Sequence, residues 1–156
     1  WFYRYSRCCY DCEYPDFRKL KSPFACDFLF CIFYIEMEAL DLIKHAIKAQ
    51  KNSQSKYSKF PVGCALLCDD NKIVYGCNIE SAVYPSTLCA ERVAIYSALS
   101  QGMQNFKAIA IVSNTKARPC GSCRQIIHEY LGNIPIYISD SKGENYILHY
   151  IYTFLN

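Results

Sequence analysis

The order in which hydrophobic periods change along residues 37–152 is the feature that most constrains the fold of this chain. Stretches with apolar residues three and four positions apart indicate helices, and they alternate with short β-rich runs, which indicate strands. The expected helices cover 37–50, 88–101 and 120–131, and the expected strands cover 62–68, 72–79, 108–112, 134–138 and 146–152. This α-β-β-α-β-α-β-β order predicts an α/β domain with a mixed sheet and helices on its faces.

Local signals mark the ends of several of these elements. Asp69-Asp70-Asn71 is a polar turn of hairpin length, so the first two strands are expected to be antiparallel. Thr87 is expected to cap the second helix, and Gly102 and Gly132 stand where the second and third helices should end. One face of an edge strand is expected to carry Tyr146, Tyr150 and Tyr152.

Residues 1–36 differ in composition from the rest of the chain. They hold 12 of the 24 aromatic residues and five of the eleven cysteines, and they show no sustained helical or strand period. Their most apolar run, 24–35, is shorter than the roughly 20 residues that cross a bilayer, and no signal-peptide cleavage site follows it. We predict that residues 1–36 are an atypical leader outside the folded domain. Two hypotheses are open for it: a membrane-touching or targeting extension, or a non-native leader before Met37. The absence of pattern favours the second, with the folded domain at 37–156.

The charge and cysteine content narrow the partners and the compartment. A net charge of +3 and a pI near 8.3 are too mild to indicate a polyanionic partner, so neither nucleic acid nor a membrane is expected to bind. Without a secretory signal the chain is expected in the cytoplasm, where thiols stay reduced. Eleven cysteines, an odd number, cannot all pair in intramolecular disulfides. The sequence therefore indicates bound metal or free thiols.

Three cysteines stand at the expected starts of helices: Cys89, Cys120 and Cys123. Free amide N–H groups and the helix dipole at such positions favour the thiolate, which is the form that binds zinc. Residues at i and i+3 share a helix face, so the C-x-x-C pair can bind one ion while Cys89 approaches from the neighbouring helix. Three protein ligands leave the fourth tetrahedral position open, which is typical of catalytic zinc. We predict one Zn²⁺ per chain.

Glu91 and two arginines are expected beside this metal site. Glu91 follows Cys89 by two residues, a position suited to hydrogen-bond a zinc-bound water, so we predict that it is the general acid and base. Arg92 and Arg124 are expected to donate hydrogen bonds to the sulfurs and to offset their negative charge. The predicted chemistry is hydrolytic deamination.

The combination of motifs is more specific than each motif alone. A C-x-x-C pair also occurs in zinc ribbons and redox sites, whereas an upstream Cys-x-Glu and a Pro directly before the pair are typical of zinc deaminases. From about Met37 to Tyr152 the sequence resembles the cytidine deaminases of the small, free-nucleoside type. The matching motifs are YSKFPVG at 57–63, GCNIE at 76–80, YP at 84–85, CAER at 89–92 and PCGSCRQ at 119–125.

This resemblance implies a three-layer cytidine-deaminase-like fold with a five-stranded mixed sheet. It also implies hydrolysis of cytidine and deoxycytidine to the uridine nucleosides and ammonia, as in pyrimidine salvage. The same zinc ligands and the same role for Glu91 follow. In addition, Asn78 and Glu80 are expected to hold the ribose hydroxyls, and the expected contacts to the rest of the substrate are Phe60, which lines the base pocket, and Ala90.

The family is typically a homotetramer with sites at subunit interfaces, so Tyr57 and Tyr84 are expected to serve a neighbouring subunit's pocket. The sequence departs from the family pattern at Ser81, where an Asn is usual, in the leader at 1–36, and at its end. Family members usually continue past this end with a Leu-Pro and a late aromatic residue. The catalytic domain is therefore expected to be truncated at its C-terminus.

Other interpretations of the same residues are open. The alternatives to cytidine and deoxycytidine deamination are a zinc-stabilised but inactive or partial subunit, and a deaminase for another aminopyrimidine nucleoside or for polynucleotide cytosine. Without the resemblance, Asn78 and Glu80 fit an exposed strand end as well as a sugar site. Small apolar side chains inside the sheet are the expected role of Cys64, Cys68 and Cys77. No role is expected for His45, His128 and His149.

Overall fold

The computed structural model describes residues 25–154. The chain divides into two units, with the boundary between residues 33 and 34. Of the first unit, residues 25–33 are described, and they are helical; the described strands all belong to the second unit. No helix between residues 25 and 154 combines the length and apolarity needed to cross a membrane.

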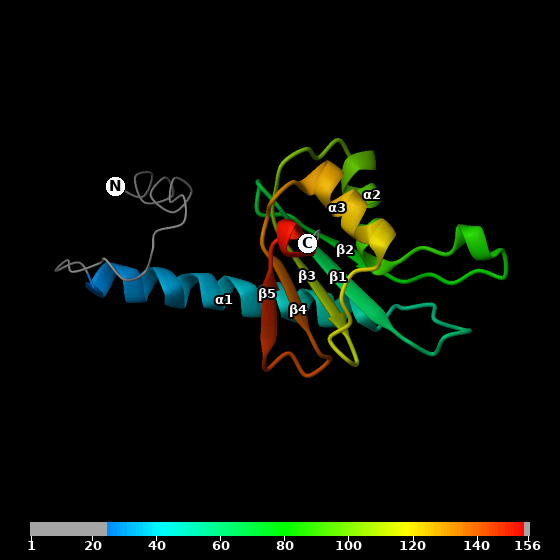
Figure 1. Ribbon diagram of the computed structural model, residues 1–156, viewed down its shortest axis with the longest axis horizontal. Coiled ribbons are helices and arrows are strands. Elements are labelled where there is room, and N and C mark those ends of the chain that lie inside the picture. Colours follow the sequence, from blue (N-terminus) through cyan, green and yellow to red (C-terminus); the bar gives the residue numbers. More distant parts are fainter. Residues whose placement is uncertain (1–24, 155–156) are drawn as a thin grey trace. The chain divides into compact units, whose positions relative to one another are not determined.

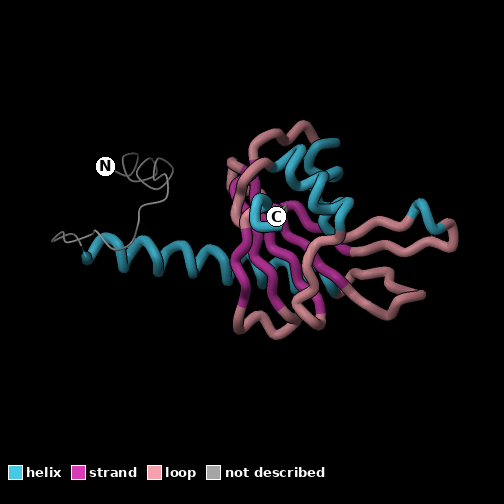
Figure 2. The backbone as a smooth tube through the Cα atoms, in the orientation of Figure 1, coloured by secondary structure: helices cyan, strands magenta, loops and turns pink. Residues whose placement is uncertain are grey.

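The elements follow the predicted order α-β-β-α-β-α-β-β, with short 3₁₀ turns added. The helices are α1 (Ala25–Gln50), α2 (Ala90–Ser100) and α3 (Gly121–Leu131), and the 3₁₀ turns are η2 (Tyr84–Ser86) and η3 (Ile151–Phe154). The strands are β1 (Val62–Cys68), β2 (Ile73–Cys77), β3 (Phe106–Ser113), β4 (Ile136–Ser139) and β5 (Tyr146–His149). Figures 1 and 2 show these elements along the chain.

The strands form one five-stranded sheet in the order β2-β1-β3-β4-β5. The predicted hairpin is confirmed, because β1 pairs antiparallel with β2. β1 also pairs antiparallel with β3, and β4 pairs antiparallel with β5, whereas β3 and β4 are parallel and joined through α3. The sheet is therefore mixed, as predicted.

Alternate residues of each strand face two separate cores, which gives the second unit three layers. Cys64, Leu66, Ile109 and Ile111 pack with residues of α2 and α3 in one core. Ala65, Leu67, Ala108, Ala110 and Val112 pack in the other core with Ala39, Leu42, Ile43 and Ala46 of α1. Figure 1 shows α2 and α3 side by side over one face of the sheet. Because residues on both faces of β1 and β3 are buried, helices must cover both faces of the sheet.

The topology brings the starts of α2 and α3 to the same end of the sheet, at the carboxyl ends of β2 and β3. β2 and β3 are both antiparallel to β1, so they run in the same direction. α2 begins shortly after the end of β2, and α3 begins shortly after the end of β3. Since each helix returns along the sheet to the start of a later strand, the two helices are parallel neighbours and their N-termini meet at the carboxyl ends of these strands.

Two glycines let helices approach the sheet closely. A Cβ atom at Gly76 in β2 would lie 2.2 Å from the Ala90 carbonyl oxygen and 2.6 Å from the Ala94 nitrogen in α2. A Cβ at Gly63 in β1 would lie 2.1 Å from the Ala46 carbonyl oxygen in α1. The first contact fixes the first turn of α2 directly against β2, and therefore sets the position of the residues that begin this helix.

The structure corrects the predicted start of the first helix at residue 37, because α1 begins at Ala25. Residues 28–35 are almost uniformly apolar, so no amphipathic period marks them as helical in the sequence. Once the amphipathic part of the helix has formed, extending it is easier than starting a new helix, since nucleation is the unfavourable step.

Two boundary predictions are also wrong. Thr87 does not cap α2: the N-cap is Cys89, because Leu88 is held in an extended bridge to Ile79, and the Thr87 Oγ1 accepts a hydrogen bond from the Ser81 N–H instead. β5 ends at His149, which pairs with Ile136, the first residue of β4. Residues beyond His149 have no strand beside them to pair with in the described part of the sheet, and they turn into η3, so the tyrosines at 146, 150 and 152 do not share one strand face.

Candidate metal centre and active site

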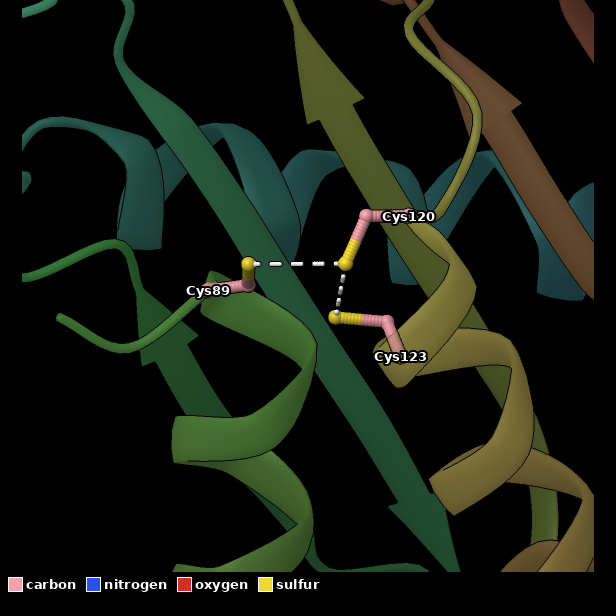
Figure 3. Close-up of side chains that lie close together, drawn as sticks. All are labelled: Cys89, Cys120 and Cys123. Atoms are coloured by element: carbon pink, nitrogen blue, oxygen red, sulfur yellow. Dashed lines mark hydrogen bonds between the residues drawn. The ribbon is translucent and has the colours of Figure 1, made fainter. Parts of the chain in front are cut away.

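The three predicted metal-binding cysteines come together at the paired helix starts. Cys89 is the N-cap of α2, Cys120 is the N-cap of α3, and Cys123 lies in the first turn of α3. The Sγ atoms of Cys89 and Cys120 are 3.9 Å apart, and those of Cys120 and Cys123 are 3.4 Å apart. Figure 3 shows the three sulfurs pointing toward one another from the two helices. The structure thus brings the three predicted metal-binding residues together in one cluster.

The geometry and chemistry of this cluster fit a zinc ion. The three Sγ atoms lie within 4.8 Å of one another, and in the described part of the chain this is the group of at least three His, Cys, Asp or Glu residues that could hold a metal. Sulfurs bound tetrahedrally at Zn–S distances of about 2.3 Å lie roughly 3.8 Å apart, close to the two measured separations. The cluster therefore has the size and the soft donors that zinc requires, with three protein ligands rather than four.

The local environment prepares the sulfurs for metal binding. Hydrogen bonding from the Cys123 thiol and from Arg92 lowers the pKa of Cys89 to about 5, against the opposing effect of burial. The pKa of Cys123 is raised, because its thiol donates a hydrogen bond to the Cys89 sulfur, is buried, and lies near the negative charge of Glu91. These interactions favour the thiolate at Cys89, and the negative charge near Cys123 favours a cation that can replace its proton.

Glu91 is buried against the cysteine cluster. It lies in the first turn of α2, only 4% of its surface is exposed, and its carboxylate is close enough to Cys89 and Cys123 to interact with them electrostatically. Burial, assisted by the charge of the Cys89 thiolate, raises the pKa of Glu91 to about 7. A carboxyl group with this pKa can both accept and donate a proton near neutral pH.

Arg92 contacts the cluster as predicted. Its Nη2 donates to the Cys89 Sγ at 3.6 Å and to the Thr87 carbonyl oxygen at 3.0 Å. The second contact anchors the guanidinium, so that one donor remains directed at the sulfur. Arg124 lies in the first turn of α3, where its backbone N–H donates to the Cys120 carbonyl oxygen at 2.9 Å. A contact between the Arg124 side chain and a sulfur stays a prediction.

Asn78, an expected sugar ligand, holds the loop that connects α1 to β1. Its side chain is 8% exposed. The Asn78 Oδ1 accepts from the Ser53 Oγ at 2.6 Å and from the Val62 N–H at 2.9 Å, and its Nδ2 donates to the Phe60 carbonyl oxygen at 2.9 Å. Phe60, expected in the base pocket, is half-buried. Asn78 positions it through the hydrogen bond to its backbone carbonyl oxygen.

Glu80, the second expected sugar ligand, holds the same loop farther out. Its Oε2 accepts from the Tyr57 N–H at 2.7 Å and from the Ser58 N–H at 3.1 Å, and its Oε1 accepts from the Ser58 hydroxyl. The Ser58 hydroxyl, more than any other group, lowers the pKa of Glu80 below its ordinary value. The loop 51–61 and the segment 78–89 extend from the same end of the sheet in Figure 1, and a parallel bridge between Gln54 and Ile79 joins them.

The remaining predicted site residues differ in exposure. Ala90 is the first residue of α2, directly after the N-cap Cys89, and it is fully buried. Tyr57 and Tyr84 are 59% and 80% exposed on the two loops, so each side chain is available to another molecule. Cys64 and Cys68 are buried, as expected, and Cys77 is half-buried. Cys64 lies close enough to Glu91 that the carboxylate charge adds to burial in raising the pKa of its thiol.

Sequence reasoning missed Ser58. Its hydroxyl joins Glu80 to the backbone of Phe60, since the Phe60 N–H donates to the Ser58 Oγ at 3.1 Å. The one sequence signal was local: a serine two residues before Phe60 is able to form this kind of side chain–backbone turn. Its link to Glu80, across 22 positions of the chain, has no such signal.

Comparisons with known proteins agree with this geometry. Residues 37–136 match the family model described as the cytidine and deoxycytidylate deaminase zinc-binding region. A curated cytidine deaminase of Sporosarcina psychrophila is 46% identical over 111 residues, which cover 69% of this chain and 82% of the relative. A curated cytidine deaminase of Halalkalibacterium halodurans is 44% identical over 108 residues, which cover 63% of this chain and 82% of the relative.

A solved structure gives the same result for the fold. The crystal structure of cytidine deaminase from Burkholderia pseudomallei superposes with a TM-score of 0.67 at 36% sequence identity, covering 71% of this chain and 91% of that chain. The predicted fold and the predicted resemblance are both confirmed. The chain belongs to the cytidine and deoxycytidylate deaminase family.

Proposed function

We propose that the chain is a zinc-dependent hydrolase that converts cytidine and deoxycytidine to uridine and deoxyuridine with release of ammonia. The observation that carries this proposal is the buried Glu91 carboxylate, which lies beside a cluster of three cysteine sulfurs that are within 4.8 Å of one another. The identity of the curated relatives, which are named cytidine deaminases, supports the substrate.

In this proposal Cys89, Cys120 and Cys123 hold one Zn²⁺ per chain. Zinc bound by three protein ligands lowers the pKa of a coordinated water toward 7, which supplies hydroxide at neutral pH. Arg92 offsets the negative charge of the sulfurs through its hydrogen bond to Cys89. We assign the same effect to Arg124 on the other helix.

Glu91 moves the protons of the reaction. It accepts a proton from the attacking water and passes it to the ring nitrogen of the pyrimidine. It then accepts the remaining proton of the hydroxyl group added at C4 and delivers it to the departing amine, so that the C4–N bond breaks and the C4 carbonyl forms. A pKa of about 7 suits both directions of transfer, because the carboxyl group changes protonation state at little cost near neutral pH. Because Glu91 is buried, bulk water is kept from exchanging protons with its carboxyl group during these transfers.

The substrate is held at two ends. We assign the base to Phe60 and to the backbone around Ala90, and the ribose hydroxyls to Asn78 and Glu80. The Asn78 and Glu80 side chains already hold the loop 53–62 in place, so a nucleoside meets oriented acceptors and loses less free energy to ordering them. The negative charge of Glu80 strengthens a hydrogen bond from a sugar hydroxyl.

We further propose that the enzyme is a homotetramer in which Tyr57 and Tyr84 complete a neighbouring subunit's pocket. The exposure of both rings supports this assignment, since large exposed aromatic side chains are common at subunit interfaces. The proposed catalytic domain is 37–156, and the proposed role is pyrimidine salvage in the cytoplasm.

The test is ammonia release by the purified full chain with cytidine, deoxycytidine and single-stranded DNA at matched cytosine concentration. The proposal requires release from both nucleosides and none from the polynucleotide. Native mass spectrometry of the same sample should show four chains and one zinc per chain. Bound zinc without ammonia release would identify an inactive zinc-stabilised subunit and overturn the proposed activity.

A further inference from the structure

Ser58 lies between the two ends of the proposed nucleoside site. Its hydroxyl donates to the Glu80 Oε1, and its backbone N–H donates to the Glu80 Oε2 at 3.1 Å. The same hydroxyl oxygen accepts from the Phe60 N–H at 3.1 Å. One side chain therefore contacts both the carboxylate assigned to the sugar and the backbone of the residue assigned to the base.

The backbone of Phe60 is held on both sides by groups from the proposed sugar site. Its N–H is held by the Ser58 hydroxyl, which Glu80 orients, and its carbonyl oxygen accepts from the Asn78 Nδ2 at 2.9 Å. Between Ser58 and Phe60, Lys59 has a positive φ of 55°, so the loop turns sharply at this point. A sharp turn of a non-glycine residue persists when neighbouring contacts stabilise it, and the Ser58 contacts flank this one.

We propose that Ser58 is a positioning residue that couples recognition of the sugar to recognition of the base. This inference rests on the proposed function, since it takes Glu80 and Phe60 as substrate contacts. The Ser58 hydroxyl orients the Glu80 carboxylate toward the sugar and fixes the loop on which Phe60 is presented. A sugar hydroxyl that binds Glu80 therefore binds a group whose orientation already depends on the position of Phe60.

Loss of the Ser58 hydroxyl should weaken binding at both ends without changing the chemistry. Glu80 loses a hydrogen bond to its charged carboxylate, and the Phe60 N–H loses its acceptor. The cysteine cluster and Glu91 do not contact Ser58 through any hydrogen bond between described residues. We therefore expect Ser58→Ala to raise the KM for cytidine about 10- to 100-fold and to leave kcat within about threefold of wild type.

The experiment compares four full-length proteins. Ser58→Ala removes the hydroxyl, and Ser58→Thr keeps one and should recover most of the affinity. Ser55→Ala is the matched control from the same loop: its backbone carbonyl accepts from the Lys59 N–H at 3.2 Å, but its hydroxyl makes no hydrogen bond within the described residues. This control should match wild type in KM.

A readout independent of activity separates this inference from the proposed function. Hydrogen exchange of peptides covering 55–62 should be at least about tenfold faster in Ser58→Ala than in wild type, Ser55→Ala or Ser58→Thr. Unchanged exchange, or a fall in kcat without a rise in KM, would overturn the positioning role. If wild type releases no ammonia while the exchange difference is present, the proposed substrate fails and the Ser58 link between Glu80 and Phe60 stands.

Discussion

Arg92 reaches back along the first turn of α2 to Cys89, with its Nη2 3.6 Å from the Cys89 Sγ. The arginine and the sulfur belong to the same short segment, CAER, so their spacing is set by the helix itself. Three thiolates on one divalent cation leave a net negative charge, and this guanidinium is placed to reduce it.

Replacing Arg92 with Gln should therefore shift the acidic limb of the pH–rate profile to higher pH. Without the guanidinium the sulfurs transfer more negative charge to the metal, which becomes a weaker Lewis acid. We expect a decrease of about tenfold in kcat/KM at pH 7. The measurement is kcat/KM for cytidine across pH 5–9, with the exposed Arg118→Gln as the matched control. A profile that keeps its shape and position would remove Arg92 from this role.

Replacing Cys120 with Ala should abolish zinc binding and activity together. Two sulfurs remain, and two ligands do not form a stable zinc site. Zinc per chain after dialysis, measured by elemental analysis beside the activity, should drop from about one to near zero. Cys68→Ala is the control: this thiol is buried in β1 and contacts Met103, so its loss should lower stability by about 1 kcal/mol and leave zinc in place. Retention of full zinc by Cys120→Ala would disprove the ligand set.

Replacing Glu91 with Gln should separate metal binding from catalysis. The amide fills the same volume but cannot carry a proton, so kcat should fall by a factor of about 10² to 10⁴ while zinc content is unchanged. Glu38→Gln, at an exposed position of α1, is the control and should retain full kcat. An active Glu91→Gln enzyme would show that another group transfers the proton.

Replacing Gly76 with Ala should displace the start of α2. The new Cβ would lie 2.2 Å from the Ala90 carbonyl oxygen and 2.6 Å from the Ala94 nitrogen. Both are backbone atoms of α2, so the helix itself must move. We expect a loss of about 1–3 kcal/mol in unfolding free energy and weaker zinc binding. Gly121→Ala is the control, because no atom outside its immediate neighbours lies closer to the added Cβ than the Arg124 Nη2 at 4.0 Å. Equal denaturation midpoints for the two variants would contradict this interpretation.

The stability contributed by Glu80 should depend on pH. Its pKa in the folded chain is lowered below the ordinary 4.5, chiefly by the Ser58 hydroxyl, so the ionised form stabilises the fold. This stability is fully present above the unfolded pKa and is lost as the pH falls through the folded pKa. The thermal midpoint of wild type should exceed that of Glu80→Gln at pH 7, and the gap should close as the pH falls below 4.5. A gap that is the same at pH 7 and at low pH would exclude a role for the charge.

The fold could be predicted where the sequence carried a clear local signal. β1 and β3 are short apolar runs buried on both faces, and the turn at 69–71 is short and polar, so these strands and the first hairpin were evident from the sequence. The start of α1 was not, because a segment that is apolar all round has no period. The end of β5 was not, because it depends on where β4 begins, and β4 begins after Pro135, which has no N–H to donate to a ladder.

The cysteine cluster was predictable for a different reason. Helix starts can be located from local signals, and two such starts at the carboxyl ends of strands running in the same direction must lie close together. The contacts of Ser58 with Glu80 and of Asn78 with Phe60 join positions 22 and 18 apart through side chains on a loop. Such contacts depend on the tertiary path of the loop, which no local pattern specifies.

The ligands of the cluster stand on either side of α2 and β3, since Cys89 and Cys120 are 31 positions apart. An ion held by both residues acts as a crosslink that closes a ring of chain around the central strand of the sheet. By loop-closure entropy, a ring of this size restricts the unfolded ensemble by an amount worth on the order of 3 kcal/mol. A zinc ion in the proposed active site would thereby also crosslink the chain around β3. Its removal by a chelator should loosen β3 together with the proposed active site.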